Sequence, residues 1–434
     1  MTASRRIITR AVESLRVATR LGALVWIVSG CSIRQPVLPV HIVPGPVGNE
    51  IPSIPQRRPD RTTRVCDIAA FDMAEGSGRD VGSVVQECIS LARPGDVVTL
   101  PPGKYRIDRQ IVIDRPLWLT SGDLGPSDPP CRSEDTRCAE LVAGEDFHEK
   151  FGLLTTARGT KRVVIDHVIF NGNKDERQDS RAAEICRRGG NNNKHGYNVG
   201  LQSCIDCWFL NSVSRNALCG TALEVVSTNV AFSRFEDNGL HKRYLWADGL
   251  TAKECPGKFV YQNYFARNTD VDCVVGTGPC DVIGNRIVHE PKFRTSSFAA
   301  INLFTFFRHE APHAGTRVAK NTIDCGDRRG CGAAIHMGSD AWAPGGSRRP
   351  VAGPVYVYDN YIQGAQGGIL IDTGNDIRLS RNVIHATGGR YHAGCGDRDF
   401  PLASRSEQST ITSTEEVFPY EVIEWEYCVP NHDF

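Results

Sequence analysis

Residues 259–289 read FVYQNYFARNTDVDCVVGTGPCDVIGNRIVH, and this stretch repeats one short pattern. The pattern is an apolar residue, two variable residues, asparagine, one variable residue, and then isoleucine or phenylalanine. It places Asn263 and Asn285 22 residues apart, and Asn360 and Asn382 are separated by the same 22 residues. A period in the low twenties indicates a solenoid, in which each unit buries one strip of side chains against its neighbours.

The residues between the asparagines favour strands over helices. Short β-branched runs, asparagines at the bends and frequent glycines are typical of strands joined by sharp corners. Ile287, Ile323 and Ile362 each lie two residues after a repeat asparagine, so we expect them in one buried stack. The sequence therefore predicts a parallel β-helix over residues 65–390, whose long outer faces can hold an extended polymer.

A helix precedes the first strands. After Asp80, apolar residues recur at helical spacing as far as Ala92. ARPGDVV (residues 92–98) then turns into LPPGKY (residues 100–105). A solenoid exposes an apolar end, and a short N-terminal capping helix covers it. These two segments resemble the opening of pectate-lyase-like right-handed parallel β-helix proteins. The resemblance implies the fold and, more loosely, lyase, hydrolase or epimerase chemistry on polysaccharides.

The N-terminus has the features of an export signal. Arginines precede an apolar run at residues 21–28, which is about half the length that spans a bilayer. Ser29-Gly30-Cys31 follows and resembles a bacterial lipobox, in which Cys31 is lipidated. The alternative is an ordinary signal peptide with an accidental cysteine. The lipobox predicts a protein held in the bacterial cell envelope, on either the periplasmic or the surface side. Ser32 after the cysteine favours the outer membrane.

The segments outside the coils differ from them in composition. Residues 32–64 are rich in proline and predict an extended linker between the anchor and the folded body. Residues 173–198 and 338–354 lack periodicity and predict long loops. Residues 391–434 lose the repeat and predict a tail that caps the C-terminal end.

Charge and cysteine content restrict the partners and the compartment. The 50 basic residues balance 50 acidic residues, so composition gives no reason to expect a nucleic-acid partner. The sixteen cysteines lack a zinc pattern and favour disulfides in an oxidising compartment. Three close pairs predict local disulfides: Cys131/Cys138, Cys325/Cys331 and Cys273/Cys280. If Cys31 is lipidated, an odd number of cysteines is left, so at least one thiol stays free or pairs outside the chain.

Alternation of side chains along the strands predicts the outer surface of the coils. If Cys273, Ile301 and Ile335 point inward, then Asp272, Asn302 and His336 point outward in one lane, with Asp248 at its edge. Strict counting from Asn263 instead places Asp272 inward, where an unpaired carboxylate is costly. We expect the outward register because it places the apolar residues of these strands inside. Should Asp272 point inward onto a buried partner, the interpretation without catalysis follows.

Asp270 and Asp272 are the central pair of this predicted site, and three chemistries use such a pair. One carboxyl can act as general acid while the other activates water for glycoside hydrolysis. Alternatively, Asp270 and Asp272 can hold Ca²⁺ against a uronate, with Lys253, Arg267 or His336 as the base of a lyase or epimerase. Asn268-Thr269-Asp270 is similar to the first motif of polygalacturonases, but the later motifs of that family are absent.

Further residues complete the predicted site. Lys253, Arg267 and Asn302 are candidates for substrate binding, and His241 and Arg243 lie on a basic segment at the rim. Together these features predict an envelope-anchored, polysaccharide-active β-helix protein. The alternative is a glycan-binding or structural surface lipoprotein without catalysis.

Overall fold

The fold is seen in a computed structural model that describes residues 53–57, 61–69, 79–290, 297–306, 312–326, 330–338, 351–365, 367–371, 374–385 and 411–413. The chain divides into two units, residues 1–41 and 42–434. The signal peptide, Cys31, most of the linker and nearly all of the predicted tail lie outside the described residues, as does most of 338–354.

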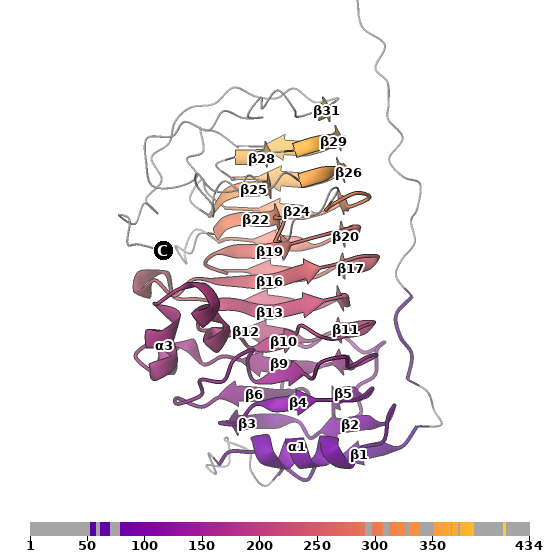
Figure 1. Cartoon of the computed structure of the whole chain (residues 1–434), viewed down its shortest axis with the longest axis vertical. Helices are drawn as coiled ribbons and strands as arrows, with labels where there is room; N and C mark the ends of the chain where they lie inside the picture. The colour runs from indigo at the N-terminus through magenta and orange to yellow at the C-terminus, as the bar shows by residue number, and fades with distance from the viewer. Residues whose placement is uncertain are drawn as a thin grey trace, which may run out of the picture. The chain divides into compact units, whose positions relative to one another are not determined.

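The second unit is a stack of coils built from three parallel sheets, shown in Figure 1. Sheet A contains β1 (Thr63–Val65), β2 (Val97–Leu100), β5 (Trp118–Ser121), β8 (Val164–Asp166), β11 (Cys207–Leu210), β14 (Thr228–Ala231), β17 (Lys258–Tyr261), β20 (Cys280–Ile283), β23 (Arg317–Ala319), β26 (Val351–Tyr358), β29 (Gly374–Ser380) and β31 (Ile411–Ser413). Sheet B contains β3 (Gly103–Ile107), β6 (Ala139–Ala143), β9 (Val168–Asn171), β12 (Val213–Arg215), β15 (Arg234–Glu236), β18 (Tyr264–Ala266), β21 (Arg286–Val288), β24 (Thr322–Asp324), β27 (Tyr361–Gln363) and β30 (Val383–His385).

Sheet C contains β4 (Ile111–Ile113), β7 (Leu154–Thr156), β10 (Val199–Leu201), β13 (Gly220–Val226), β16 (Ala247–Glu254), β19 (Val271–Val275), β22 (Ser297–Leu303), β25 (Cys331–Met337) and β28 (Gly367–Ile371). The central coils each contribute one strand to each sheet, and neighbouring strands of a sheet come from successive coils. Parallel strands connected in this way form right-handed crossovers in nearly all known folds. The chain is therefore a right-handed parallel β-helix, as the repeat and the family resemblance predicted.

The repeat asparagines form a ladder at the bend between sheets A and B. The side-chain Nδ2 of Asn263 donates to Oδ1 of Asn285 over 3.1 Å, and Asn285 donates in the same way to Asn321 over 3.0 Å. Asn321 and Asn360 continue the series to Asn382. The residue before each asparagine has positive φ, which makes the bend sharp. The ladder thus satisfies buried polar groups at every turn.

The predicted isoleucine stack is confirmed. Ile287 pairs in register with Ile323, which pairs with Ile362, and all three side chains are fully buried. Phe265 is the register partner of Ile287 in the preceding coil, so aromatic packing continues the same column. The ring centroids of Phe235 and Phe265 lie 5.0 Å apart. This column is the continuous core on which the coils stack.

The N-terminal end is closed as predicted by a short helix, α1 (Gly82–Leu91), which buries Val85 and Ile89. The Asp80 carboxylate accepts a hydrogen bond from the Gly82 amide over 2.9 Å. In the part of the chain that the structure describes, no helix has the length and apolar character needed to cross a bilayer.

Residues 173–198 form helices and not the predicted irregular loop. They contain α2 (Lys174–Arg177), α3 (Arg181–Cys186) and the 3₁₀ helix η3 (Gly190–Gly196). The guanidinium of Arg177 is fully buried, and it donates to the carbonyls of Gly172 and Phe147, each over 2.7 Å. A disulfide joins Cys186 to Cys219. The buried guanidinium and the disulfide that hold these helices do not recur along the sequence, so the repeat pattern could not predict them.

Six disulfides link twelve cysteines of the described residues: Cys66–Cys88, Cys131–Cys138, Cys186–Cys219, Cys204–Cys207, Cys255–Cys280 and Cys325–Cys331. The predicted pairs Cys131–Cys138 and Cys325–Cys331 are confirmed. The predicted pair Cys273–Cys280 is wrong, because Cys280 bonds to Cys255 one coil away and Cys273 is a buried free thiol.

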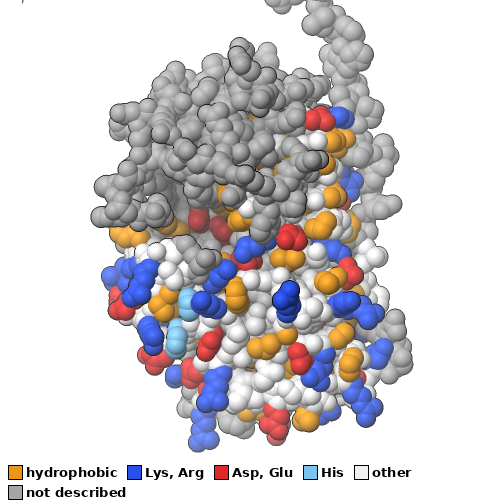
Figure 2. Space-filling view, in the orientation of Figure 1, with side chains coloured by type: hydrophobic (Ala, Val, Ile, Leu, Met, Phe, Trp, Pro, Cys, Tyr) orange, Lys and Arg blue, Asp and Glu red, His pale blue; other side chains and the backbone are white. Residues whose placement is uncertain are grey.

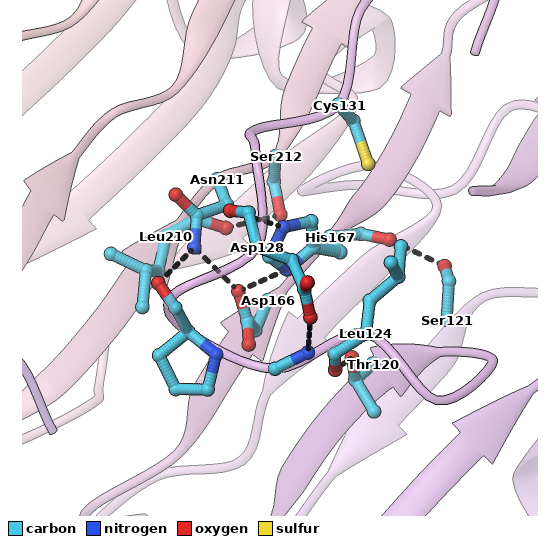
Figure 3. Close-up of polar contacts among 12 residues, drawn as sticks. Thr120, Ser121, Leu124, Asp128, Cys131, Asp166, His167, Leu210, Asn211 and Ser212 are labelled. Carbon is cyan, nitrogen blue, oxygen red and sulfur yellow. Dashed lines mark hydrogen bonds and ion pairs between the residues drawn. The ribbon is translucent and has the colours of Figure 1, made fainter. Parts of the chain in front are cut away.

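The end of the predicted linker lies on the outer face of sheet A. The Arg57 guanidinium stacks over the Trp118 ring and donates to the Thr120 hydroxyl over 2.8 Å. Figure 3 shows the polar cluster beside it, where buried Asp166 accepts a hydrogen bond from Asn211 over 3.0 Å and lies 2.7 Å from Nδ1 of His167. Strand β1 also begins at residue 63, inside the segment predicted to be linker. The folded body therefore starts earlier than the repeat indicated.

Candidate functional site

The outer face of sheet C carries the predicted site residues. Glu224, Thr251, Val274, Asn302 and His336 are register partners on five successive strands, and we call this row the outer lane. Their chain neighbours, such as Leu250 and Ala252, belong to the hydrophobic core, so the outer lane points away from it. Asn302 and His336 thus lie in one row, as predicted. Val274 occupies the position that the prediction gave to Asp272.

Asp272 points inward, and its predicted outward register is wrong. It is fully buried in the same row as Ala300, a core residue. Its Oδ1 accepts a hydrogen bond from Asn268 over 2.7 Å, and its Oδ2 lies 2.7 Å from Nε2 of His289. The Ser297 hydroxyl donates to the same Oδ2 over 3.2 Å. Buried donors on three sides give this carboxylate the partners that an interior position requires.

A second asparagine ladder explains why an aspartate occupies this position. At the bend between sheets B and C, Nδ2 of Asn238 donates to Oδ1 of Asn268 over 2.7 Å, and Asn268 donates in turn to Asp272. Asp272 is therefore the acceptor at the end of this ladder. It contributes to the structure of the bend and is withdrawn as a catalytic residue.

Asp248 faces the opposite way, onto the outer surface. Its neighbour Ala247 is a core residue, and a Cβ on Gly249 would meet the Phe265 ring at 3.0 Å, so both neighbours face inward. The Asp248 carboxylate accepts hydrogen bonds from the Thr251 hydroxyl over 2.7 Å and from the Val271 amide over 3.1 Å. The side chain remains partly exposed.

Asp248 and Asp270 form a coupled pair of partly exposed carboxyls. Burial, together with the charge of Asp270, raises the pKa of Asp248 well above its usual range. Burial raises the pKa of Asp270 to about 6. Two neighbouring carboxyls that resist ionisation together retain a proton near neutral pH. Such a pair can supply a proton donor and a proton acceptor at once.

The predicted cation site at Asp270 and Asp272 is not formed. All the contacts of the Asp272 oxygens come from buried side chains, whereas Asp270 lies beside Asp248 on the outer surface. Among the described residues, no three histidine, cysteine or acidic side chains converge as metal ligands would.

Lys253 is held in a polar cluster next to the pair. Its ammonium lies 2.7 Å from Oε1 of Glu224, a nearly fully buried carboxylate in the outer lane. The Tyr197 hydroxyl donates to Oε2 of Glu224 over 2.9 Å. Burial and the charge of Glu224 raise the pKa of Tyr197. Tyr197 follows η3, so the helical insertion supplies one wall of this cluster.

An aromatic pair forms the rim beside Asp248. Trp246 immediately precedes β16 and is two residues before Asp248. The exposed Tyr244 packs edge-on against Trp246, with ring centroids 6.1 Å apart. The indole Nε1 of Trp246 donates to Nδ1 of His241 over 3.3 Å, which places His241 at the edge of the indole. In Figure 2, which views the face carrying β10, β13 and β16, acidic and basic side chains lie close together with apolar ones between them.

The remaining predicted residues lie at the edges of the site. Arg267 makes a two-point ion pair with Asp237 at the bend between sheets B and C, with Nη2–Oδ2 at 2.8 Å. Arg243, in the 3₁₀ helix η4 (His241–Arg243), is exposed and lies 3.8 Å from Asp179 of the insertion. Both cations thus already face carboxylates.

Sequence reasoning missed Tyr197 and Glu224. Their hydrogen bond joins residues 27 positions apart across the helical insertion, and no repeat marks either residue. The outward position of Glu224 could have been predicted from the sequence, because Glu224 occupies the strand position equivalent to Thr251 in the preceding coil. Tyr244 had none, because its exposure depends on the αL turn that ends η4.

Comparisons with known proteins find similarity in structure only. No family model and no characterised sequence matches the chain. An endo-xylogalacturonan hydrolase from Aspergillus tubingensis is similar at 11% identity and a TM-score of 0.47, covering 81% of this chain and 99% of that one. A surface adhesin of Streptococcus pneumoniae is similar at 12% identity and a TM-score of 0.46, covering 76% and 91%. The chain also matches a protein of Geobacillus virus E2 at 14% identity and a TM-score of 0.40, covering 75% of this chain but only 62% of that protein.

At 11% to 14% identity, these likenesses concern the fold alone. Function therefore has to be argued from the residues on the outer face of sheet C.

Proposed function

We propose that the outer face of sheet C binds a polysaccharide and that Asp248 and Asp270 hydrolyse its glycosidic bonds. The observation that carries this proposal is the coupled pair itself, two partly exposed carboxyls whose pKa values are both raised. Perturbed carboxyls gather at functional sites because acid–base chemistry requires them. The exposed ring of Tyr244 and the half-buried ring of Trp246, close to Asp248 in the chain, offer apolar faces on which sugar rings can stack.

The two carboxyls have different roles in the proposed reaction. Burial and the charge of Asp270 raise the pKa of Asp248 well above its usual range, so in the proposed reaction Asp248 serves as general acid and protonates the glycosidic oxygen as the bond to the anomeric carbon breaks. Asp270 is ionised above about pH 6 and takes a proton from the water whose oxygen attacks that carbon. The water adds across the bond, and the proton taken by Asp270 balances the proton given by Asp248. Activity should therefore follow a bell-shaped pH profile.

The test is an assay for new reducing ends on a panel of neutral and uronate polysaccharides. Asp248→Asn and Asp270→Asn should each lower kcat by at least about a hundredfold, because acid and base act in one transition state. Asp206→Asn, on the exposed turn before β11, removes one carboxylate away from sheet C and serves as the matched control. Full activity of both site variants would refute the mechanism. Unsaturated products would indicate a lyase instead.

Binding without turnover is the second candidate function. An inward Asp272 with a buried partner is the condition under which the sequence predicts binding without catalysis, and the structure meets it. Catalysis is proposed first only because Asp248 and Asp270 form a different pair of carboxyls. In that case the wild-type protein binds a glycan of the panel but releases no new ends, and Trp246→Ala weakens binding more than Asp270→Asn does.

We also propose that the protein is anchored in the bacterial cell envelope through a lipid on Cys31. The support is the small residues before Cys31 and the proline-rich residues after it. The number of disulfides is typical of an oxidising compartment outside the cytoplasm. The site would then act on polysaccharide of the envelope or its surroundings.

A further inference from the structure

The charges around Asp248 and Asp270 restrict which sugars can enter. The groups that hydrogen-bond to Asp248 are the Thr251 hydroxyl and the Val271 amide, which are both neutral. Among the described residues, the charged groups that shift the pKa of Asp248 are Asp270 and Asp272, which are both acidic. A uronate carboxylate bound here would add a third negative charge beside two groups that already resist ionisation.

Lys253 is on the same strand as Asp248, β16, and Glu224 neutralises its charge. Glu224 is nearly fully buried and cannot turn to solvent, and both of its oxygens have partners, Lys253 at 2.7 Å and Tyr197 at 2.9 Å. The ammonium is therefore directed toward β13, the neighbouring strand that carries Glu224. Since Tyr197 fixes Glu224 from the other side, the ion pair is held by the helical insertion.

Two other cations of the rim also face carboxylates. Arg267 makes its two-point contact with Asp237, and the exposed Arg243 lies 3.8 Å from Asp179. To gain a counter-charge from Lys253, Arg267 or Arg243, an anionic sugar would have to break an existing contact.

Asn302 supplies an observation independent of charge. It lies in the outer lane one strand beyond Val274, is fully buried, and both polar atoms of its amide lack a partner. A buried amide without partners is costly, and a sugar hydroxyl can donate to its Oδ1 or accept from its Nδ2. Asn302 has no exposed surface, so an uncharged hydroxylated ligand satisfies its amide only after the atoms that cover it move aside.

We infer that the site takes an uncharged polysaccharide, and that Glu224 determines this specificity by withholding Lys253 from anionic sugars. The inference rests on the proposed function and adds the substrate class to it. Glu224 acts through Lys253 and is a positioning residue, which touches no reacting atom.

The experiment compares two forms of one backbone, polygalacturonate and the same polymer fully methyl-esterified, with a neutral galactan and a neutral glucan beside them. Affinity is measured at low and high salt for the full-length wild-type protein. We expect the esterified polymer or a neutral glycan to bind several-fold more tightly than polygalacturonate. Tighter binding of polygalacturonate that weakens with salt would overturn the inference but leave the proposed function standing. Binding of none of the polymers would overturn the proposed function.

Glu224→Gln tests the specificity residue directly. The isosteric amide keeps the space filled but releases the Lys253 ammonium, so affinity for polygalacturonate should rise about two- to fivefold, the range of a single exposed ion pair. Adding Lys253→Met to Glu224→Gln should abolish this gain, and Asp206→Asn should show none. A gain that persists without Lys253, or no gain in a Glu224→Gln protein with an unchanged circular dichroism spectrum, would refute the role of Glu224.

Discussion

Asp272→Asn should destabilise the fold without removing a reacting group. In the wild-type protein the carboxylate accepts hydrogen bonds from Asn268 and Ser297 and contacts Nε2 of His289 inside the coil. An asparagine at this position has one oxygen and one amide nitrogen in place of two oxygens. Whichever way the new amide turns, its nitrogen faces a group that donates in the wild-type protein.

The expected loss of folding stability is set by whichever orientation of the new amide costs less free energy. If the nitrogen faces Asn268, two Nδ2 donors oppose each other and neither can adapt. If it faces His289, the Ser297 hydroxyl can rotate to accept, and the imidazole can move its proton to Nδ1. Nδ1 is buried and has no hydrogen-bond partner among the described residues, so one buried donor remains unsatisfied. That loss costs about 1–3 kcal/mol. Asp272→Ala removes every acceptor and should cost more.

The assay is urea denaturation followed by circular dichroism, with Asp270→Asn as the matched control. Both variants make the same chemical change two residues apart on the chain. We expect the midpoint to fall for Asp272→Asn, to fall further for Asp272→Ala, and not to fall for Asp270→Asn. If Asp272→Asn unfolds at the wild-type urea concentration while abolishing turnover, the structural role is refuted and the catalytic interpretation from the sequence returns.

Three further predictions follow from the core, the pH response and the anchor. Burial raises the pKa of Asp270 to about 6, so the folded state holds a proton that the unfolded chain releases; wild-type stability should fall as the pH rises from about 4 to above 6, and melting scans of Asp270→Asn should show a smaller fall. Ile323→Ala in the fully buried stack should cost about 2–5 kcal/mol by denaturation, whereas an unchanged midpoint would contradict the coil alignment. Cys31→Ser should move the protein from the membrane fraction to the soluble fraction or leave an unprocessed precursor, and wild-type fractionation of the variant would exclude the lipobox.

The repeat allowed the fold to be predicted because its signal is physical and recurrent. An asparagine at each bend must meet an equivalent asparagine in the next coil, and the isoleucine two residues later must meet its own equivalent. Both requirements recur with the coil, so one sequence displays them several times. The Cys131–Cys138 and Cys325–Cys331 disulfides were predicted for a related reason, since short loops bring their ends together.

The orientation of Asp272 was not predicted because sheet C bends where simple alternation assumes a straight strand. Asp272 and Cys273 are consecutive, yet both face the interior. The same irregularity occurs in the preceding coil, where Gly249 and Leu250 both face inward. Counting from the asparagine gave the correct result, whereas the preference for apolar residues inside did not. The polar partners that make Asp272 tolerable come from His289 and Ser297, which sequence pattern alone does not connect to it.

The two asparagine ladders differ in a way that bears on how such a protein can change over generations. In the ladder from Asn263 to Asn382, each rung meets an identical rung, so a whole coil can be duplicated or lost and the joined ends still match. The ladder through Asn238 and Asn268 instead stops at Asp272, which no other coil can replace in kind. The protein can therefore gain or lose whole coils on either side during evolution, while the coil that carries Asp248 and Asp270 is kept. Among the described turns, the interrupted ladder marks a position where one turn cannot be exchanged for another.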